Sequence, residues 1–209
     1  DTVAMLIDRY QIGVTKMNDV IYFQIDSDGR CRTGKIMKYN HETGKRVKDE
    51  HTKGKINWAH SILKRTGHLP EEWELTQCLF GEHLLKQFPN MPVALVESEK
   101  TAIICSGLMP DYLWLATGGK SQFNERLKVL YGRDVVAFPD VDGYTTWCEK
   151  VKDFPDLNIS VSNLLQSNAT PEDMENHIDI ADWLIRWKLQ PETFETEKRN
   201  ITFEKVKAF

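Results

Sequence analysis

Carboxylates at the ends of two predicted strands are the residues of this sequence best suited to metal-ion chemistry. Glu97 directly follows the apolar run 93–96, and Asp140 and Asp142 follow the run 135–138. Functional groups of a parallel α/β sheet collect at the carboxyl ends of its strands. If the two runs are neighbouring strands, the three carboxylates meet at one edge. The alternation in Asp-Val-Asp directs both aspartates to the same side of an extended loop.

A cluster of this kind needs a counter-ion, because like charges in a partly dry site repel each other. Mg²⁺ takes oxygen ligands, keeps several waters, and is commonly held by a few carboxylates together with substrate phosphates. We therefore predict that Glu97, Asp140 and Asp142 bind Mg²⁺ or Mn²⁺. The alternative for any single strand-end aspartate is a helix N-cap or an exposed loop acid.

A second acidic pair, Asp179 and Asp182, lies three residues apart in a predicted helix, which places both on one helix face. We predict that this pair holds or positions a second ion. Two metal ions can stabilise both the attacking and the leaving oxygen of a phosphoryl transfer.

The elements that position these acids are predicted from short apolar runs alternating with helical stretches. This alternation is typical of a parallel sheet built from βαβ units. The predicted strands are 93–96, 112–116, 135–138 and 159–161, and the predicted helices between them are 99–106, 124–131 and 145–153.

Capping residues support these helices. Ser98 is a suitable N-cap for the helix 99–106, and Gly107 is a suitable residue to follow its end. Thr170 and Pro171, followed by two acids, are typical of a helix start and predict a helical region that reaches Trp187.

The residues before about position 90 predict a small α+β unit. Its expected elements are a helix at 2–10, strands at 20–25 and 32–39 joined by a turn at 27–29, a second turn at 42–44, and helices at 58–64 and 73–88. We therefore predict an α+β subdomain over 1–90, an α/β domain with a central parallel sheet flanked by helices over 91–190, and a C-terminal tail over 191–209.

Positive charge is concentrated in the first predicted domain. Residues 30–65 contain eleven Lys or Arg and three Asp or Glu, although the whole chain has a net charge of −4. A basic segment beside an acidic site suits a metal-dependent enzyme that acts on a polyanion. The alternative is a pair of solvated, lysine-rich hairpins. The residues predicted to bind nucleic-acid phosphates are Lys35, Lys38, Arg46, Lys48, Lys53, Lys55 and, in the second domain, Lys120.

Composition excludes several other classes of protein. No apolar run approaches the roughly 18 residues of a membrane helix, and no signal segment precedes the first helix, so we expect a cytoplasmic protein. The four cysteines lack metal-ligand spacing, and reduced thiols are expected.

The near match to a phosphate-binding loop at 29–36 has Ile36 where Ser or Thr should bind Mg²⁺, and its glycines fit a hairpin. Because the chain begins at Asp1 inside a predicted helix, we expect it to be part of a longer protein.

The acidic segments resemble the successive motifs of the toprim domain, over about half of the chain. The resemblance is carried by Val93–Ala102, Val135–Gly143 and Asp179–Leu184, with Thr117–Lys120 at the position of a small-residue turn. Toprim domains occur in bacterial replicative primases, topoisomerases and some nucleases. The resemblance implies Mg²⁺ (or Mn²⁺) as cofactor and Glu97 as a metal ligand or as the general base that activates a nucleotide 3′-hydroxyl.

The first half of the chain resembles the catalytic core of bacterial primases. The short motifs that carry this resemblance are Arg9–Gly13, Val20–Gly29, Thr33–Lys35, Lys38–Asn40 and Leu79–Gly81. The overall pattern resembles uncharacterised toprim proteins of Bacteroides-type genomes and their mobile elements. One departure is Ser98, where primases usually have glycine after the first glutamate.

Three functions follow from these observations. The first is primase-like, Mg²⁺-dependent nucleotidyl transfer on single-stranded nucleic acid, in DNA replication or mobile-element maintenance. The second is metal-dependent nuclease cleavage, and the third is a nucleic-acid-binding accessory module with a vestigial acidic site. The resemblance implies single-stranded DNA or RNA and nucleotides as partners, with a helicase or an upstream zinc-binding module as further candidates. No tyrosine is placed for the covalent strand transfer of a topoisomerase.

Overall fold

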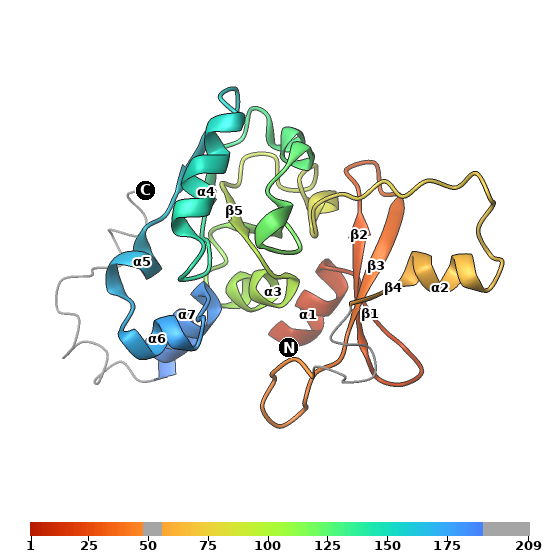
Figure 1. The fold of residues 1–209 in the computed structure, drawn as a ribbon, viewed down its shortest axis with the longest axis horizontal. Coiled ribbons are helices and arrows are strands. Elements are labelled where there is room, and N and C mark those ends of the chain that lie inside the picture. Colours follow the sequence, from red (N-terminus) through yellow and green to blue (C-terminus); the bar gives the residue numbers. More distant parts are fainter. Residues whose placement is uncertain (48–55, 190–209) are drawn as a thin grey trace. The chain divides into compact units, whose positions relative to one another are not determined.

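The computed structural model describes residues 1–47 and 56–189 of the chain. The chain divides into two compact units, Asp1–Gln87 and Phe88–Phe209, whose elements can be followed in Figure 1. Lys48, Lys53, Lys55 and the expected tail over 191–209 lie outside the described residues. No helix in the described part is long and apolar enough to cross a membrane.

The first unit is built on an antiparallel sheet of four strands in the order β1-β2-β3-β4. The predicted hairpin forms, because β2 pairs with β3 along its whole length, and the glycines of the near phosphate-loop motif lie in this hairpin. The elements of the unit are α1 (Thr2–Arg9), β1 (Ile12–Val14), β2 (Val20–Ile25), β3 (Cys31–Met37), β4 (Asn57–Trp58), α2 (Ala59–Arg65) and η1 (Glu82–Leu84).

The turn of this hairpin is organised by the buried carboxylate of Asp26. Asp26 Oδ1 accepts the backbone N–H groups of Asp28 and Arg30, each at 2.9 Å. Its Oδ2 accepts Arg30 Nε at 2.9 Å and Arg32 Nε at 2.7 Å. Burial raises the pKa of Asp26, but these hydrogen bonds outweigh it and lower the pKa to about 2. Gly29 takes a φ of +81°, which suits glycine.

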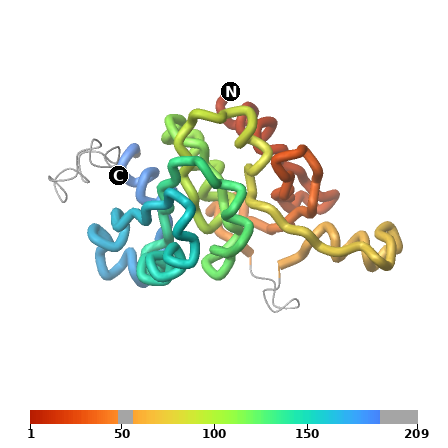
Figure 2. Tube along the Cα trace, turned by 90° about the horizontal axis from the view of Figure 1, so that it is seen from above, coloured from red at the N-terminus to blue at the C-terminus, as the bar shows by residue number. Residues whose placement is uncertain are grey.

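The predicted helix at 73–88 is wrong, since only the single turn η1 is helical there. The backbone is held by other partners: Glu82 accepts the N–H groups of Ser27 and Leu79 at 3.1 and 3.0 Å. Phe80 stacks on Tyr10 with ring centroids 5.3 Å apart, so tertiary packing overrides local helix propensity. Figure 2 shows the yellow trace between α2 and η1 running without helical turns.

The second unit contains a parallel sheet of four strands in the order β6-β5-β7-β8, which confirms the predicted α/β class with helices flanking a parallel sheet. Its elements are β5 (Val93–Val96), α3 (Glu99–Leu108), β6 (Leu113–Ala116), η2 (Lys120–Gln122), η3 (Glu125–Leu130), β7 (Val135–Ala137), α4 (Tyr144–Lys150), η4 (Val151–Asp153), β8 (Ile159–Val161), α5 (Leu164–Asn168), α6 (Pro171–Glu175) and α7 (Ile180–Leu189).

Every residue of β5, β6 and β7 is buried. Uninterrupted apolar runs are typical of parallel strands that are covered on both faces. Helix α3 contacts β5, β6 and α7. Trp114, Trp147 and Trp183 are among the most completely buried side chains, as expected of core tryptophans. The four cysteines are free, as predicted.

The predicted caps are confirmed in two of three cases. Ser98 accepts the Thr101 N–H at the start of α3, and Thr170 and Asp173 form a capping box at the start of α6. The assignment of Gly107 was wrong, because α3 continues through it to Leu108. The expected helical region to Trp187 is divided into α6 and α7. Within the helix predicted at 124–131, the 3₁₀ helix η3 spans Glu125–Leu130.

Candidate metal centre

The carboxyl edge of the parallel sheet brings Glu97 next to the loops that follow β6 and β7. Strand β5 lies between β6 and β7, so the residue after β5 is flanked by both loops. The Glu97 side chain is buried, with 6% of the residue exposed. Its Oε1 accepts the Asp140 N–H at 3.3 Å, and its backbone carbonyl accepts the Gly118 N–H at 2.9 Å. Glu97 is therefore held by the backbone of both neighbouring loops.

Gly143 provides the space for this carboxylate. A Cβ atom at Gly143 would lie 2.7 Å from Glu97 Oε1 and 3.0 Å from Pro139 Cβ, both too close for a relaxed side chain. The Gly143 N–H donates to the Asp140 carbonyl at 2.7 Å, which closes the loop into a turn. This role of Gly143 was not predicted from the sequence, where the residue appears only as part of the segment Val135–Gly143. The signal available was a glycine directly after Asp-Val-Asp, at the start of a helix.

Asp140 lies in the same loop, half-buried. The adjacent Val141 N–H donates to the Ile178 carbonyl at 3.1 Å, and this bond joins the loop to the segment before α7. Burial is the main reason that the pKa of Asp140 rises to about 8, and the negative charges of Glu97, Asp179, Asp142 and Asp182 raise it further. The predicted acids thus form one electrostatic cluster.

The pKa of Glu97 is also raised, first by burial. The Asp140 N–H and the positive charge of Lys120 act in the opposite direction, while Asp142 and Asp179 add to the rise. A carboxyl whose pKa is shifted toward neutrality is suited to take up or release a proton. The environment of Glu97 is therefore compatible with the role of general base.

Asp179 and Asp182 cap the start of α7 reciprocally. Asp179 Oδ1 accepts the Asp182 N–H at 2.9 Å, and Asp182 Oδ2 accepts the Asp179 N–H at 3.3 Å. Thr101 Oγ1, on α3, donates to Asp179 Oδ2. Burial and the charge of Asp179 raise the pKa of Asp182. The pair has a structural role in addition to any metal role, because it satisfies N–H groups that a helix start leaves unbonded.

Lys120 is part of the acidic cluster. Its Nζ donates to Asp142 Oδ2 at 2.9 Å and to the Asp142 carbonyl at 2.8 Å. His177 Nδ1 lies 3.7 Å from the same Asp142 Oδ2. Two glycines with positive φ, Gly118 and Gly119, precede Lys120 and turn the chain after β6. The residue that we predicted to contact nucleic acid therefore pairs with a candidate metal ligand.

The acids fit Mg²⁺ by donor type and by electrostatics. Carboxylate oxygens are the ligands that Mg²⁺ takes from proteins, and the raised pKa of both Glu97 and Asp140 reflects a desolvated cluster of like charge that a divalent cation would relieve. Within residues 1–47 and 56–189, however, no three His, Cys, Asp or Glu side chains already form a group arranged to hold a metal ion. Asp142 Oδ2 instead accepts a hydrogen bond from Lys120 Nζ.

The predicted basic residues differ in exposure. Lys38 and Arg46 are exposed: Lys38 directly follows β3, and Arg46 forms an isolated antiparallel bridge with Tyr39. Lys35 is only 5% exposed, because it lies in β3 between Tyr22 of β2 and Trp58 of β4. Lys35 therefore does not contribute to an exposed basic surface. The three predicted lysines after Val47 fall outside the described residues.

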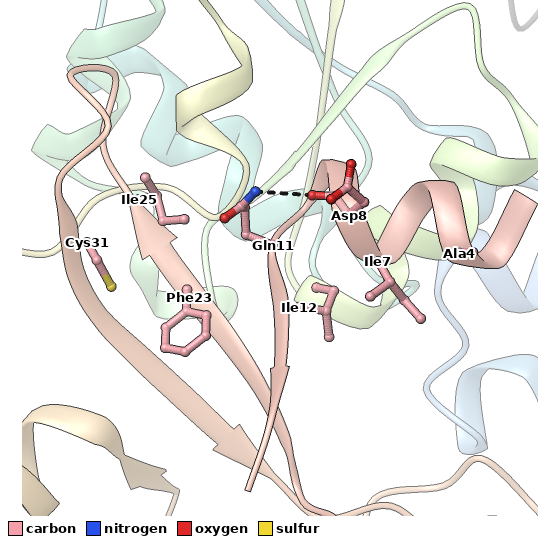
Figure 3. A pocket seen from close by; sticks show the side chains of 8 residues that line it. All are labelled: Ala4, Ile7, Asp8, Gln11, Ile12, Phe23, Ile25 and Cys31. Carbon is pink, nitrogen blue, oxygen red and sulfur yellow. Dashed lines mark hydrogen bonds between the residues drawn. The ribbon is translucent and has the colours of Figure 1, made fainter.

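A separate hollow of about 650 Å³ lies in the first unit, between α1 and the sheet. Figure 3 shows its lining of mostly apolar side chains, with Gln11 Nε2 bonded to the Asp8 carbonyl. Asp8 is the one acidic side chain among its lining residues, which are Ala4, Ile7, Asp8, Gln11, Ile12, Phe23, Ile25 and Cys31. This hollow lacks the paired carboxylates of the candidate centre.

Comparisons with known proteins found one matching family and a set of similar solved structures. The model of a family described as "Domain of unknown function (DUF6371)" matches residues 1–141, a range that includes Glu97 and Asp140 and ends before Asp142. No curated protein matches the sequence.

The similar solved structures include primase fragments. The primase fragment of the bacteriophage T7 primase-helicase protein is 12% identical, with a TM-score of 0.49 over 83% of this chain and 68% of its own. A DnaG catalytic core is 14% identical, with a TM-score of 0.49 over 90% and 73%. The RNA polymerase domain of Mycobacterium tuberculosis primase DnaG is 11% identical, with a TM-score of 0.46 over 93% and 69%.

Proposed function

We propose that this chain, which belongs to the DUF6371 family, is a primase-like nucleotidyltransferase that depends on Mg²⁺ or Mn²⁺ and acts on single-stranded nucleic acid. The observation that carries the proposal is the meeting of Glu97 and Asp140 at the ends of the neighbouring strands β5 and β7, where Glu97 Oε1 accepts the Asp140 N–H at 3.3 Å. The raised pKa of Asp140, to which Glu97, Asp142, Asp179 and Asp182 contribute, is consistent with one acidic cluster. Acids gathered from β5, β7 and α7 are costly to a fold unless a cation offsets them.

The roles of the acids follow from their positions. Asp140 and Asp142 would hold the metal ion together with Glu97, and Asp179 and Asp182 would hold or position a second ion. A bound divalent cation neutralises phosphate charge and orients the attacking and leaving oxygens of the transfer. Glu97 Oε1 is held by a backbone N–H, which keeps the carboxylate directed toward the loop of Asp140. The shifted pKa of Glu97 suits it to accept a proton from a nucleotide 3′-hydroxyl.

The substrates would be nucleoside triphosphates and a single-stranded DNA or RNA template. Exposed Lys38 and Arg46 would contact template phosphates without reading bases. A helicase or an upstream zinc-binding module would be the partner in DNA replication. The role in mobile elements and the likeness to Bacteroides-type toprim proteins rest on the sequence resemblance alone.

The test is metal-dependent primer synthesis on single-stranded DNA, with ribonucleotides and with deoxyribonucleotides. We expect Glu97→Gln to lower the rate on the order of 10²-fold or more while leaving nucleic-acid binding nearly intact, because the amide keeps the size but neither ligates metal well nor accepts a proton. Glu125→Gln is the matched control, since Glu125 is exposed and pairs with Lys128 at the surface.

The outcome separates the proposal from its alternatives. If wild type shortens the labelled substrate and Glu97→Gln does not, the protein is a nuclease and not a polymerase. If wild type binds single strands but catalyses no metal-dependent reaction, both enzymatic functions are rejected and the protein is a nucleic-acid-binding accessory module. Wild-type activity in Glu97→Gln would refute the mechanism.

A further inference from the structure

We propose that Lys120 is a built-in counter-ion of the metal centre, which competes with the divalent cation for Asp142 and is released to bind an anion once the cation is bound. The inference rests on the proposed function, because it concerns the regulation of the same centre. It predicts that binding of the metal and binding of a phosphate anion strengthen each other through one side chain.

The contacts of Lys120 are the first support. The ammonium donates to both the carboxylate and the backbone carbonyl of Asp142, at 2.9 and 2.8 Å. The side chains of Lys120 and Asp142 are 38% and 41% exposed, so ions from solution can reach both. The charge of Lys120 also acts on Glu97, on the neighbouring strand end. The ammonium thus lies among the acids that would hold the metal.

The anchoring of the loop is the second support. The Lys120 carbonyl accepts Trp147 Nε1 at 3.4 Å, and Trp147 is fully buried. The next residue, Ser121, has its carbonyl bonded to Lys150 Nζ at 3.2 Å. These bonds fix the backbone, while a lysine has four flexible methylene groups between backbone and charge. The side chain can therefore exchange partners without movement of the loop.

The energetic consequence has a definite sign. Two cations cannot share one carboxylate oxygen without repulsion, so the ammonium weakens binding of the metal. An exposed ion pair contributes about 1 kcal/mol at most, which corresponds to about fivefold in affinity. Once displaced, the ammonium lacks its carboxylate partner and lies beside the bound cation, where a phosphate can pair with both. Linkage then requires that metal and phosphate raise each other's affinity by the same factor.

Binding of Mn²⁺ alone, measured by electron paramagnetic resonance of the free ion, tests the competition on the whole chain. We expect Lys120→Met and Lys120→Gln to bind Mn²⁺ about fivefold more tightly than wild type. The matched control is Lys128→Met, because Lys128 is an exposed lysine of the same unit that pairs with Glu125. Its Mn²⁺ affinity should equal that of wild type. Equal or weaker affinity in both Lys120 variants would overturn the inference.

Inorganic pyrophosphate tests the coupling. Pyrophosphate should strengthen Mn²⁺ binding to wild type by a larger factor than it strengthens Mn²⁺ binding to Lys120→Met. Mn²⁺ and pyrophosphate also form a complex in solution, but this complex is the same in both measurements and therefore does not affect the comparison of the two proteins. Equal factors would overturn the release of Lys120.

Failure of the proposed function looks different from failure of this inference. If Asp140→Ala/Asp142→Ala binds Mn²⁺ as well as wild type, or if wild type and all variants bind none, the metal centre itself is rejected and the inference with it. If that double variant loses Mn²⁺ while the Lys120 variants match wild type, only the role of Lys120 is rejected.

Discussion

Two aspartates of this chain, Asp26 and Asp140, follow strands in different units and have opposite environments. Asp26 accepts two backbone N–H groups and two arginine side chains, and its pKa falls to about 2. Asp140 is surrounded by four other acids, and burial and their charge raise its pKa to about 8. The charge of the first carboxylate is compensated by its hydrogen-bond partners, whereas the charge of the second is opposed by neighbouring carboxylates.

Asp26 has the environment of a structural acid, and Asp140 is the acid for which we propose a function. Hydrogen bonds to a charged carboxylate stabilise the folded state, and they explain why the hairpin between β2 and β3 closes at Asp26. Uncompensated charge lowers the stability of the folded state, and groups with such perturbed pKa values are concentrated at functional sites. Substitution of each aspartate distinguishes the two kinds of acid.

The largest expected effect comes from neutralising each aspartate in turn, without metal. Asp26→Asn should destabilise the first unit by about 2 to 4 kcal/mol, because it removes one partner of a buried charged network. Asp140→Asn should leave the free energy of unfolding unchanged or raise it, because repulsion is removed. Urea unfolding in the presence of a chelator measures both. Similar losses in the two variants would mean that Asp140 is also a structural acid.

The dependence of stability on pH should have opposite signs at the two sites. The pKa of Asp26 is lowered to about 2, so its contribution is complete above the unfolded value of about 3.9 and is lost as the pH falls toward 2. The pKa of Asp140 is raised to about 8. Between about pH 4 and 8 the folded state therefore binds more protons at Asp140 than the unfolded state does, and stability falls as the pH rises.

Thermal unfolding in a chelator at several pH values checks this second sign. The fall in melting temperature between pH 5 and 8 should be smaller in Asp140→Asn than in wild type. Mn²⁺ at millimolar concentration should oppose the fall, because it binds the ionised cluster of the folded state only. A wild-type profile identical to that of Asp140→Asn would show that Asp140 does not titrate in this range.

The smallest expected effect concerns the exposed basic residues of the first unit. Charge reversal at Lys38 and Arg46 should flatten the slope of log affinity against log salt for single-stranded DNA by about 1.4, since each of the two lost phosphate contacts contributes about 0.7 on a single strand. Lys128→Glu, in the second unit, should leave the slope unchanged. If it changes the slope as much as the double variant does, the contact is not local to Lys38 and Arg46.

The sequence was informative wherever one local pattern determined the structure. The runs ending at Val96 and Ala116 predicted buried parallel strands, because an uninterrupted apolar run has few other uses between helical stretches. Ser98 and Thr170 correctly predicted helix starts, because each hydroxyl accepts a backbone N–H only three residues further along the chain. The acids after β5 and β7 could be placed at one edge from sheet topology alone.

What the sequence did not reveal depends on contacts between distant residues. The helix expected at 73–88 does not form, and Glu82 in this segment instead accepts the N–H of Ser27 in the β2–β3 hairpin. The pairing of Lys120 with Asp142 joins residues 22 positions apart, and the close approach of Gly143 to Glu97 joins residues on different strand ends. No periodicity or spacing rule encodes such pairs.

The central place of β5 in the parallel sheet also constrains how the chain folds. Its hydrogen bonds go to β6 and β7, so Glu97 reaches its final position only after two crossover connections have closed. Pairings of this kind form slowly, because loop-closure entropy is lost before the contacts are gained. We therefore expect the metal centre to assemble late in folding, with the acids kept apart and solvated until the hydrophobic sheet has already formed.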